Sequence, residues 1–151
     1  MKPKETVDFH LRWVWAKVAR LYNQEAAKHG GTMSIGYILL NIDKEGTNST
    51  KLGPKMGMEP RSLTRTLKTM EESGLIYRVQ DKIDKRKVKV FLTEKGQVMR
   101  EESKNVVVAF NEFVRKRIET EKFEVFLEVI ADINELCDHP NLFNEPANTP
   151  T

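Results

Sequence analysis

The sequence is poor in cysteine and has no long hydrophobic run. Cys137 is the only cysteine among 151 residues, which excludes an intramolecular disulfide and a zinc site built from several thiolates. No stretch approaches the roughly 18 apolar residues of a membrane span, and the first residues, MKPKETVDF, lack the apolar core of a secretory signal. We therefore expect a cytoplasmic protein that has no membrane partner.

The sequence also offers little for catalysis. Its three histidines, His10, His29 and His139, are far apart, and none stands at a metal-ligand spacing. The stretch GPKMGMEP lacks both the preceding strand and the lysine position of a phosphate-binding loop. Acidic residues are plentiful, but they fall mostly on the outer faces of predicted helices. We expect no enzymatic activity, no catalytic residue, no metal site and no cofactor.

What the sequence does contain is a concentrated block of positive charge. The segment from Lys51 to Lys95 holds twelve basic and six acidic residues, a net charge of +6. The remainder of the chain holds thirteen basic and sixteen acidic residues, a net charge of −3. A basic block on an otherwise acidic chain is typical of a protein that binds nucleic acid through one face.

The N-terminal part predicts a long helix and two shorter ones. Apolar residues recur with helical spacing from Val7 to Lys28 and lie on two sides of the helix. We therefore expect this helix to lie between its own domain and a second subunit. Thr32 or Ser34 would cap the second helix. A polar turn, EGTNS, precedes a third helix, in which Pro54 is tolerated only within the first turn.

The next segment predicts a helix with one apolar and one basic face. Pro60 suits the first helical position, and Leu63, Leu67 and Met70 share the inner face. The outer face is basic and rich in hydroxyl groups, and it comprises Arg61, Ser62, Thr64, Arg65, Lys68 and Thr69. A short helix, a turn and such a helix form a helix-turn-helix, whose second helix fits the major groove of DNA. The alternative for this face is an ordinary solvated helix surface.

Two predicted strands follow, residues 75–80 and 87–92, joined by the charged loop DKIDKR. A flexible basic hairpin of this kind is a wing, suited to phosphates or the minor groove. The wing residues that we expect to approach DNA are Lys82, Lys85, Arg86 and Lys87.

The C-terminal part predicts two more helices and a tail. Thr93 would cap a long helix that reaches Ile118, and Thr120 would cap a last helix that ends near Cys137. Because Cys137 lies on an apolar stripe, we expect its thiol to be buried. Residues 139–151, which include three prolines and no helical period, predict a disordered tail.

The segment SLTRTLKTMEESGLIYR resembles the recognition helix and following strand of the MarR family of winged helix regulators, and DKIDKRKVKVFLTEKG resembles the family's wing and the start of its fifth helix. The resemblance implies a mainly α, α+β winged helix fold. It implies a single domain over residues 1–138, with the winged helix-turn-helix at about 32–93 and dimerisation helices at about 7–28 and 94–138.

The resemblance also implies roles within the wing. Asp84 and Arg86 match the acid and the arginine that brace it, by pairing with each other or with neighbouring backbone. The chain departs from the family pattern at Ile83, which stands at the wing tip where the family often has arginine. It departs again at KLGP, beginning at Lys51, which replaces a smoother helical stretch.

In function, the resemblance implies a repressor that acts as a homodimer on a pseudo-palindromic site in double-stranded DNA. Family members commonly respond to small, often phenolic ligands, and His10, Trp13 and Tyr37 are the matching candidates for a small aromatic effector. The alternative for these three is that they are ordinary core, interface or surface residues. The rival function is a winged domain that contacts proteins and not DNA, which would need an exposed apolar patch on the recognition helix or wing.

Overall fold

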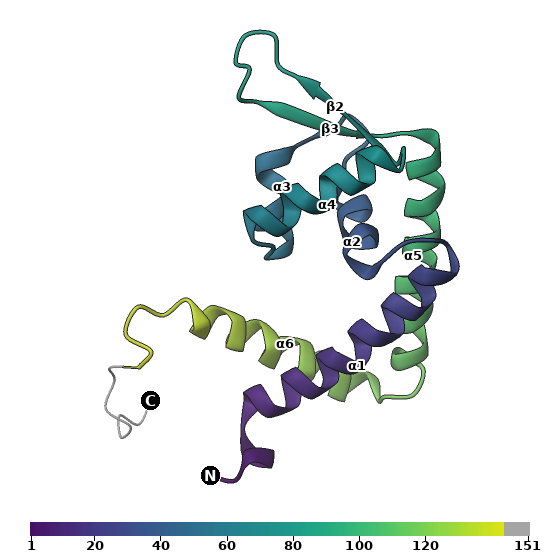
Figure 1. Cartoon of the computed structure of the whole chain (residues 1–151). Coiled ribbons are helices and arrows are strands. Elements are labelled where there is room, and N and C mark those ends of the chain that lie inside the picture. Colours follow the sequence, from purple (N-terminus) through teal and green to yellow (C-terminus); the bar gives the residue numbers. More distant parts are fainter. Residues whose placement is uncertain (144–151) are drawn as a thin grey trace. The chain divides into compact units, whose positions relative to one another are not determined.

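The computed structural model describes residues 1–143, and the chain divides into two compact units, Met1–Val108 and a second that begins at Ala109 (Figure 1). The elements are α1 (Val7–Lys28), α2 (Met33–Asn41), β1 (Thr47–Asn48), α3 (Ser49–Met56), α4 (Pro60–Glu72), β2 (Ile76–Gln80), β3 (Val88–Leu92), α5 (Glu94–Arg115) and α6 (Thr120–Cys137), preceded by a 3-10 turn (Pro3–Glu5). The mainly α winged helix fold is therefore confirmed.

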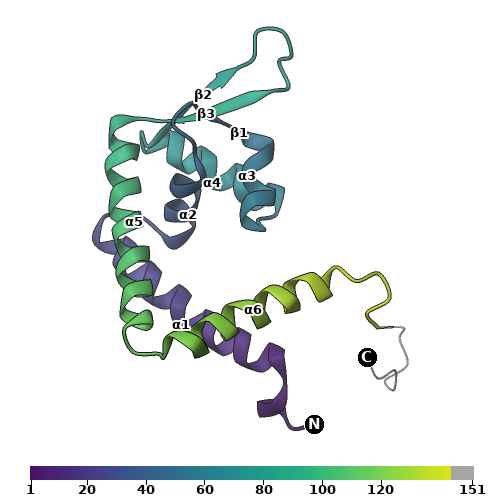
Figure 2. The same ribbon diagram turned by 180° about the vertical axis from the view of Figure 1, so that it is seen from behind.

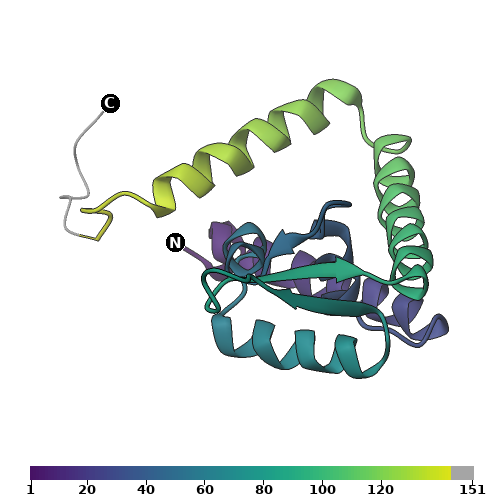
Figure 3. The ribbon, with the colours of Figure 1, turned by 90° about the horizontal axis from the view of Figure 1, so that it is seen from above.

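The first unit is built around one small antiparallel sheet with the order β1-β3-β2 (Figure 2). β2 and β3 form the hairpin of the wing, and Thr47 and Asn48 pair with Val90 and Lys89 on its other side. Seen from above, α4 runs along one side of the hairpin (Figure 3). The sheet thus fixes the wing beside α4.

Buried residues of α2, α3, α4 and the sheet form a single apolar core in this unit. The fully buried side chains are Ile38, Leu39, Ile42, Leu52, Met70, Ile76 and Val90. Leu63 and Leu67 join this core from α4, as the apolar spacing predicted. Burial of the inner face of α4 holds its outer face toward solvent.

Local signals in the sequence explain most helix ends. The Thr32 hydroxyl accepts a hydrogen bond from the Ile35 N–H at 3.3 Å and caps α2. After α4, Gly74 has a φ of 70°, and the Leu75 N–H donates to the Met70 carbonyl at 2.9 Å. This left-handed ending turns the chain from α4 into β2.

Three details differ from the expectations. Pro54 does not lie in the first turn of α3, because the helix begins at Ser49 and includes Pro54 two residues before its end. The stretch EGTNS is not only a turn, since Thr47 and Asn48 form β1. The residue that caps α6 is Glu119 rather than Thr120, and its carbonyl accepts the Phe123 N–H at 3.0 Å.

Much of the apolar surface of α1 is exposed. Only Tyr22 is buried among its residues. The exposed apolar side chains of α1 are Val7, Leu11, Trp13, Val14, Trp15 and Leu21. A helix with such a surface requires a partner to exclude water from it.

The second unit contains the end of α5 and all of α6. The Arg115 guanidinium lies 4.3 Å from the centre of the Phe123 ring and pairs with Glu124 at 3.3 Å. Phe123 is the buried residue of α6. The exposed apolar residues of this helix are Val125, Phe126, Leu127, Val129 and Leu136.

The expectation that Cys137 is buried was wrong, because it lies in the last turn of a mostly exposed helix and is itself exposed. Turns follow it to Phe143, and residues 144–151 of the predicted tail lie outside the described residues. Among residues 1–143, every helix is too short or too polar to cross a membrane. The extent of the predicted single domain stays a prediction.

Candidate nucleic-acid interface

The outer face of α4 carries the predicted DNA-contacting side chains, all of them exposed. They are Arg61, Ser62, Thr64, Arg65 and Lys68. Within the described part of the chain, Arg61 and Arg65 have no carboxylate at ion-pair distance, while Lys68 lies 3.9 Å from Glu72. Because that pair is exposed, it holds the lysine only weakly. The face therefore presents three cations that an anionic partner can reach.

The hydroxyl groups of α4 differ in what they can offer a partner. The Thr64 hydroxyl donates to the Pro60 carbonyl at 2.9 Å, so its proton is engaged within the helix. Its oxygen still accepts hydrogen bonds, for example from a base amino group. Ser62 makes no such side-chain bond in the described residues, so its hydroxyl is free to donate to a phosphate.

An ion pair joins α4 to the wing. Arg78 of β2 donates through Nε to Glu71 Oε2 at 3.0 Å, and its Nη2 contacts the same oxygen. The hydrogen bond from Arg78 lowers the pKa of Glu71, and the bond to Glu71 raises the pKa of Arg78. Arg78 therefore links the hairpin to α4 through Glu71. The sequence offered no signal for this pair, because seven residues and a turn separate the partners.

The end of α4 is also fastened to the start of α5. The Thr93 hydroxyl donates to the Gly74 carbonyl at 2.6 Å, and the Lys95 ammonium donates to the Ser73 carbonyl at 2.8 Å. A Cβ built on Gly96 would lie only 1.9 Å from the Leu75 carbonyl oxygen. This close approach permits only glycine at position 96.

The wing loop is held in shape by Asp81, a residue that the sequence analysis did not single out. One oxygen of its carboxylate accepts the N–H of Ile83 at 2.8 Å and that of Asp84 at 2.9 Å. These two bonds lower the pKa of Asp81. An aspartate that opens a turn and accepts the N–H two residues later is a common arrangement, and this signal was present in the sequence.

The other wing residues lie as follows. The Asp84 carboxylate accepts the backbone N–H of Arg86 at 3.1 Å and its Nε at 3.2 Å. The pairing between these two agrees with what the family resemblance implied, although the Arg86 side chain is 93% exposed and remains accessible to a partner. Lys82, Lys85 and Lys87 are exposed along the same loop. Their contacts with DNA stay predictions.

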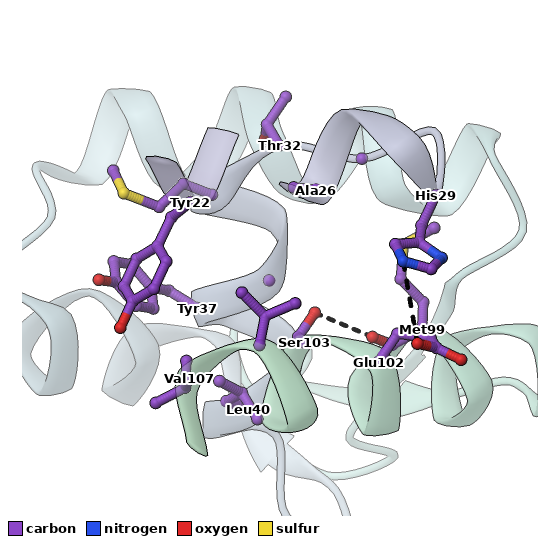
Figure 4. Close-up of a pocket in the computed structure, with 14 residues that line it drawn as sticks. Tyr22, Ala26, His29, Thr32, Tyr37, Leu40, Met99, Glu102, Ser103 and Val107 are labelled. Carbon is purple, nitrogen blue, oxygen red and sulfur yellow. Dashed lines mark hydrogen bonds and ion pairs between the residues drawn. The ribbon is translucent and has the colours of Figure 1, made fainter. Parts of the chain in front are cut away.

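A cavity of about 40 Å³ lies within the first unit, between α1, α2 and α5 (Figure 4). Tyr22 and Tyr37 stand at one end with their rings 6.2 Å apart, and His29 and Glu102 lie 3.8 Å apart at the other. Burial raises the pKa of both tyrosines, and the neighbouring Tyr37 raises that of Tyr22 further. Such a volume holds a few water molecules, so an aromatic ligand would have to widen it.

Of the three predicted ligand residues, only Tyr37 lines this cavity. His10 hydrogen-bonds through Nε2 to the Lys4 carbonyl at 2.7 Å, and Trp13 packs on Phe9. Both lie toward the start of α1, and their role with a ligand stays a prediction. The other lining residues could not be predicted from the sequence because they come from three separate helices. No group of three or more potential metal ligands occurs in residues 1–143.

Comparisons with known proteins agree with this architecture. The sequence model of the MarR family matches residues 37–88, from within α2 to the start of β3. The HTH-type transcriptional regulator SarZ of Staphylococcus epidermidis is 31% identical over 111 residues, which are 70% of this chain and 72% of SarZ. The regulator TtmR of Methylorubrum extorquens is 34% identical over 79 residues, 52% of this chain, and the match spans only 40% of TtmR.

Among solved structures, the MepR-DNA complex of S. aureus matches with a TM-score of 0.81 at 16% identity, over 86% of this chain and 97% of MepR. That likeness establishes a shared fold. Family members are transcriptional regulators and not enzymes, in agreement with the sequence analysis. The family match, the identity with SarZ and the winged helix architecture together establish that the chain belongs to the MarR family of DNA-binding transcriptional regulators.

Proposed function

We propose that the chain is a cytoplasmic repressor that binds a pseudo-palindromic site in double-stranded DNA as a homodimer. The observation that carries this proposal is the exposed basic face of α4, which lies beside the basic wing in the same unit. Arg61, Arg65 and Lys68 would enter the major groove, while the lysines of the wing hold flanking phosphates. For both α4 and the wing, the affinity would come from basic side chains that bind phosphates or guanines.

The homodimer is argued from the two exposed apolar surfaces. Val14 and Trp15 of α1 and Phe126 and Val129 of α6 are each about half exposed or more. Contiguous apolar surfaces of this kind are unfavourable in water and usually mark an interface with a partner. Because most soluble oligomers are homo-oligomers, a second copy of the chain is the partner that we propose for both surfaces. A two-fold dimer carries two copies of α4, which explains the preference for a site with two similar half-sites.

The test is binding to DNA selected from a random pool, measured by fluorescence anisotropy across a range of salt concentrations. Replacing Arg65 and Lys68 together by alanine should weaken binding at least roughly a hundredfold, because a good contact to a base is worth about 1–3 kcal/mol and each dimer loses two copies. The matched control replaces Lys104 of α5 and Lys116 in the turn just after it, which removes the same charge and should change binding little.

Salt supplies a second readout. The affinity of the unaltered protein for DNA should fall steeply as the salt concentration rises, because each basic residue that binds a phosphate releases a counterion from the DNA. No binding by the unaltered protein at low salt would overturn the proposal. Equal binding by the Arg65→Ala/Lys68→Ala variant would refute the role of α4 in DNA binding, whereas the absence of any binding by the unaltered protein would favour the rival function, a winged domain that contacts proteins and not DNA.

A second candidate function, release by a small aromatic ligand, is favoured by the cavity beside Tyr37. The lining of the cavity is mostly apolar, and the cavity lies against α5, which is fastened to the end of α4. A ligand would change DNA binding only as far as its affinities for the two forms of the protein differ. Thermal shift with a panel of aromatic acids tests this. Stabilisation that is lost on replacing Tyr37 by alanine is expected, and no stabilisation by any acid would refute it.

A further inference from the structure

Ile83 is an isoleucine at the tip of the wing whose side chain touches almost nothing. It is 97% exposed, far more than the apolar residues of α1 and α6. The loop that carries it projects beyond the helices of the first unit (Figure 1). Packing within the chain therefore gives no reason for an apolar residue at this position.

The tip that presents Ile83 is braced. Asp81 accepts the backbone N–H of Ile83 and that of the next residue, and the Asp81 N–H donates to the Lys87 carbonyl at 2.8 Å. The Gln80 side chain donates to the Lys85 carbonyl at 2.6 Å. Because these bonds engage the backbone of the tip, its exposed side chains, that of Ile83 among them, are left for a partner.

Exposed basic residues precede and follow Ile83 along the loop. Lys82, Lys85 and Lys87 are exposed, and Arg86 is 93% exposed even though it pairs with Asp84. The two aspartates of the loop are both engaged in hydrogen bonds with the loop itself. The cations can bind the phosphates that line a DNA groove, while the apolar tip can contact the faces of stacked bases, which are the apolar part of the duplex.

We propose that Ile83 enters the minor groove next to the segment bound by α4 and acts as an apolar wedge between base pairs. The inference rests on the proposed DNA-binding function and adds a determinant of specificity to it. An isoleucine has no hydrogen-bonding atom, so it cannot read the acceptors of the groove floor. It favours sites whose base steps unstack easily, such as TA and CA/TG, over stiff A-tracts.

The experiment uses the full-length protein and the DNA sequence selected from the random pool. Two duplexes share the selected core and differ only in the flank reached by the wing, one with TA steps and one with an A-tract. A 2-aminopurine base in the TA flank reports unstacking through its fluorescence. The variants are Ile83→Ala, which removes the wedge, Ile83→Leu, which keeps it, and Ile83→Arg, which replaces it with a cation.

The unaltered protein should prefer the TA flank and raise the 2-aminopurine fluorescence. Ile83→Ala should lose that rise and bind the TA duplex roughly tenfold more weakly, with an unchanged salt dependence because no charge is removed. Ile83→Leu should behave like the unaltered protein. Ile83→Arg should shift the preference to the A-tract, whose narrow groove attracts arginine, and should steepen the salt dependence. Val98→Ala, a truncation of an exposed apolar residue on α5, is the matched control and should change nothing.

The outcomes separate this inference from the function on which it rests. If the unaltered protein binds no DNA, the proposed function itself fails. If it binds well and Ile83→Ala keeps the same affinity, flank preference and fluorescence, then DNA binding stands and the wedge is refuted. Because Ile83 is so exposed, its variants should melt at the same temperature, which circular dichroism checks.

Discussion

At the scale of single residues, Asp81 controls the wing through two hydrogen bonds from one carboxylate oxygen. Asp81→Asn keeps the oxygen that accepts them, whereas Asp81→Ala removes it. We expect the backbone amides of Ile83 and Asp84 to exchange hydrogen faster in the alanine variant, and close to the unaltered rate in the asparagine variant. Hydrogen exchange followed by NMR measures this.

The lowered pKa of Asp81 gives a further check with a defined sign. A carboxylate whose pKa is lowered by folding supports the loop at any pH above its ordinary value of 3.8 and ceases to do so as the pH falls through the lowered pKa. Protection of the two amides should therefore persist at neutral pH and disappear only in strong acid. Loss of protection already near pH 6 would contradict the assigned bonds.

Gly96 is the second residue whose replacement has a definite consequence. A Cβ at this position would meet the Leu75 carbonyl oxygen at 1.9 Å, and backbone cannot move aside as a flexible side chain can. We expect Gly96→Ala to lower the free energy of unfolding by at least about 2 kcal/mol, as overpacking does. Urea unfolding measures it. Gly31→Ala is the control, since its nearest neighbour would lie at an ordinary 3.5 Å, and similar losses in both variants would contradict the steric explanation.

At the scale of elements, the Glu71–Arg78 pair couples α4 to β2. Both side chains are more than a third exposed, so a double-mutant cycle with Glu71→Ala and Arg78→Ala should give a coupling of only about 0.2–1 kcal/mol at pH 7. Because the pKa of Glu71 is lowered, the coupling is fully present above 4.5 and is lost as the pH falls through the lowered value. Urea unfolding at pH 7 and at a series of acid pH values measures both. A coupling that survives at low pH would rule out the ionic contact as its source.

The elements that could be predicted from the sequence are those defined by local signals. α1 begins at Val7 and ends at Lys28 as expected, because an apolar stripe precedes two glycines. α4 begins at Pro60 for a similar reason, since proline suits the first turn and three apolar residues share one face. Both faces of α4 were predicted correctly, including the burial of Leu67.

The features that escaped prediction depend on contacts between distant parts of the chain. β1 is two residues long, too short for any alternation, and it exists because Thr47 pairs with Val90. The lining of the cavity joins Tyr22, Tyr37 and Glu102 from three helices, and no local pattern links them. The predicted wing and α4 residues lie together on one unit, but their individual contacts with DNA stay predictions.

At the scale of the whole molecule, the proposed homodimer depends on the apolar surfaces of α1 and α6. Val14→Glu and Phe126→Glu each place a charge where we expect burial against a second copy. In analytical ultracentrifugation the unaltered protein should sediment as a dimer and each variant as a monomer. Each variant should also lose affinity for the two-half-site DNA, because one recognition helix binds far more weakly than two.

The sedimentation experiment includes a control variant and has an outcome that contradicts the proposed interface. Lys116→Glu, a charge reversal at an exposed position in the turn after α5, should remain a dimer and serves as the control. A sedimentation coefficient for Val14→Glu and Phe126→Glu that equals that of the unaltered protein would contradict both surfaces as the interface, whether or not DNA binding is retained.

The fastening of α4 to α5 has one more consequence. Thr93, Lys95 and Gly96 meet the carbonyls of residues 73–75 at three points, so the joint between the two helices is stiff. α5 therefore connects the two regions: its start contacts the end of α4, while Met99, Ser103 and Val107 further along it form a wall of the cavity. If a molecule widened the cavity by displacing this wall, the contacts at the start of α5 would transmit the displacement to α4. The angle between α4 and the DNA would then change.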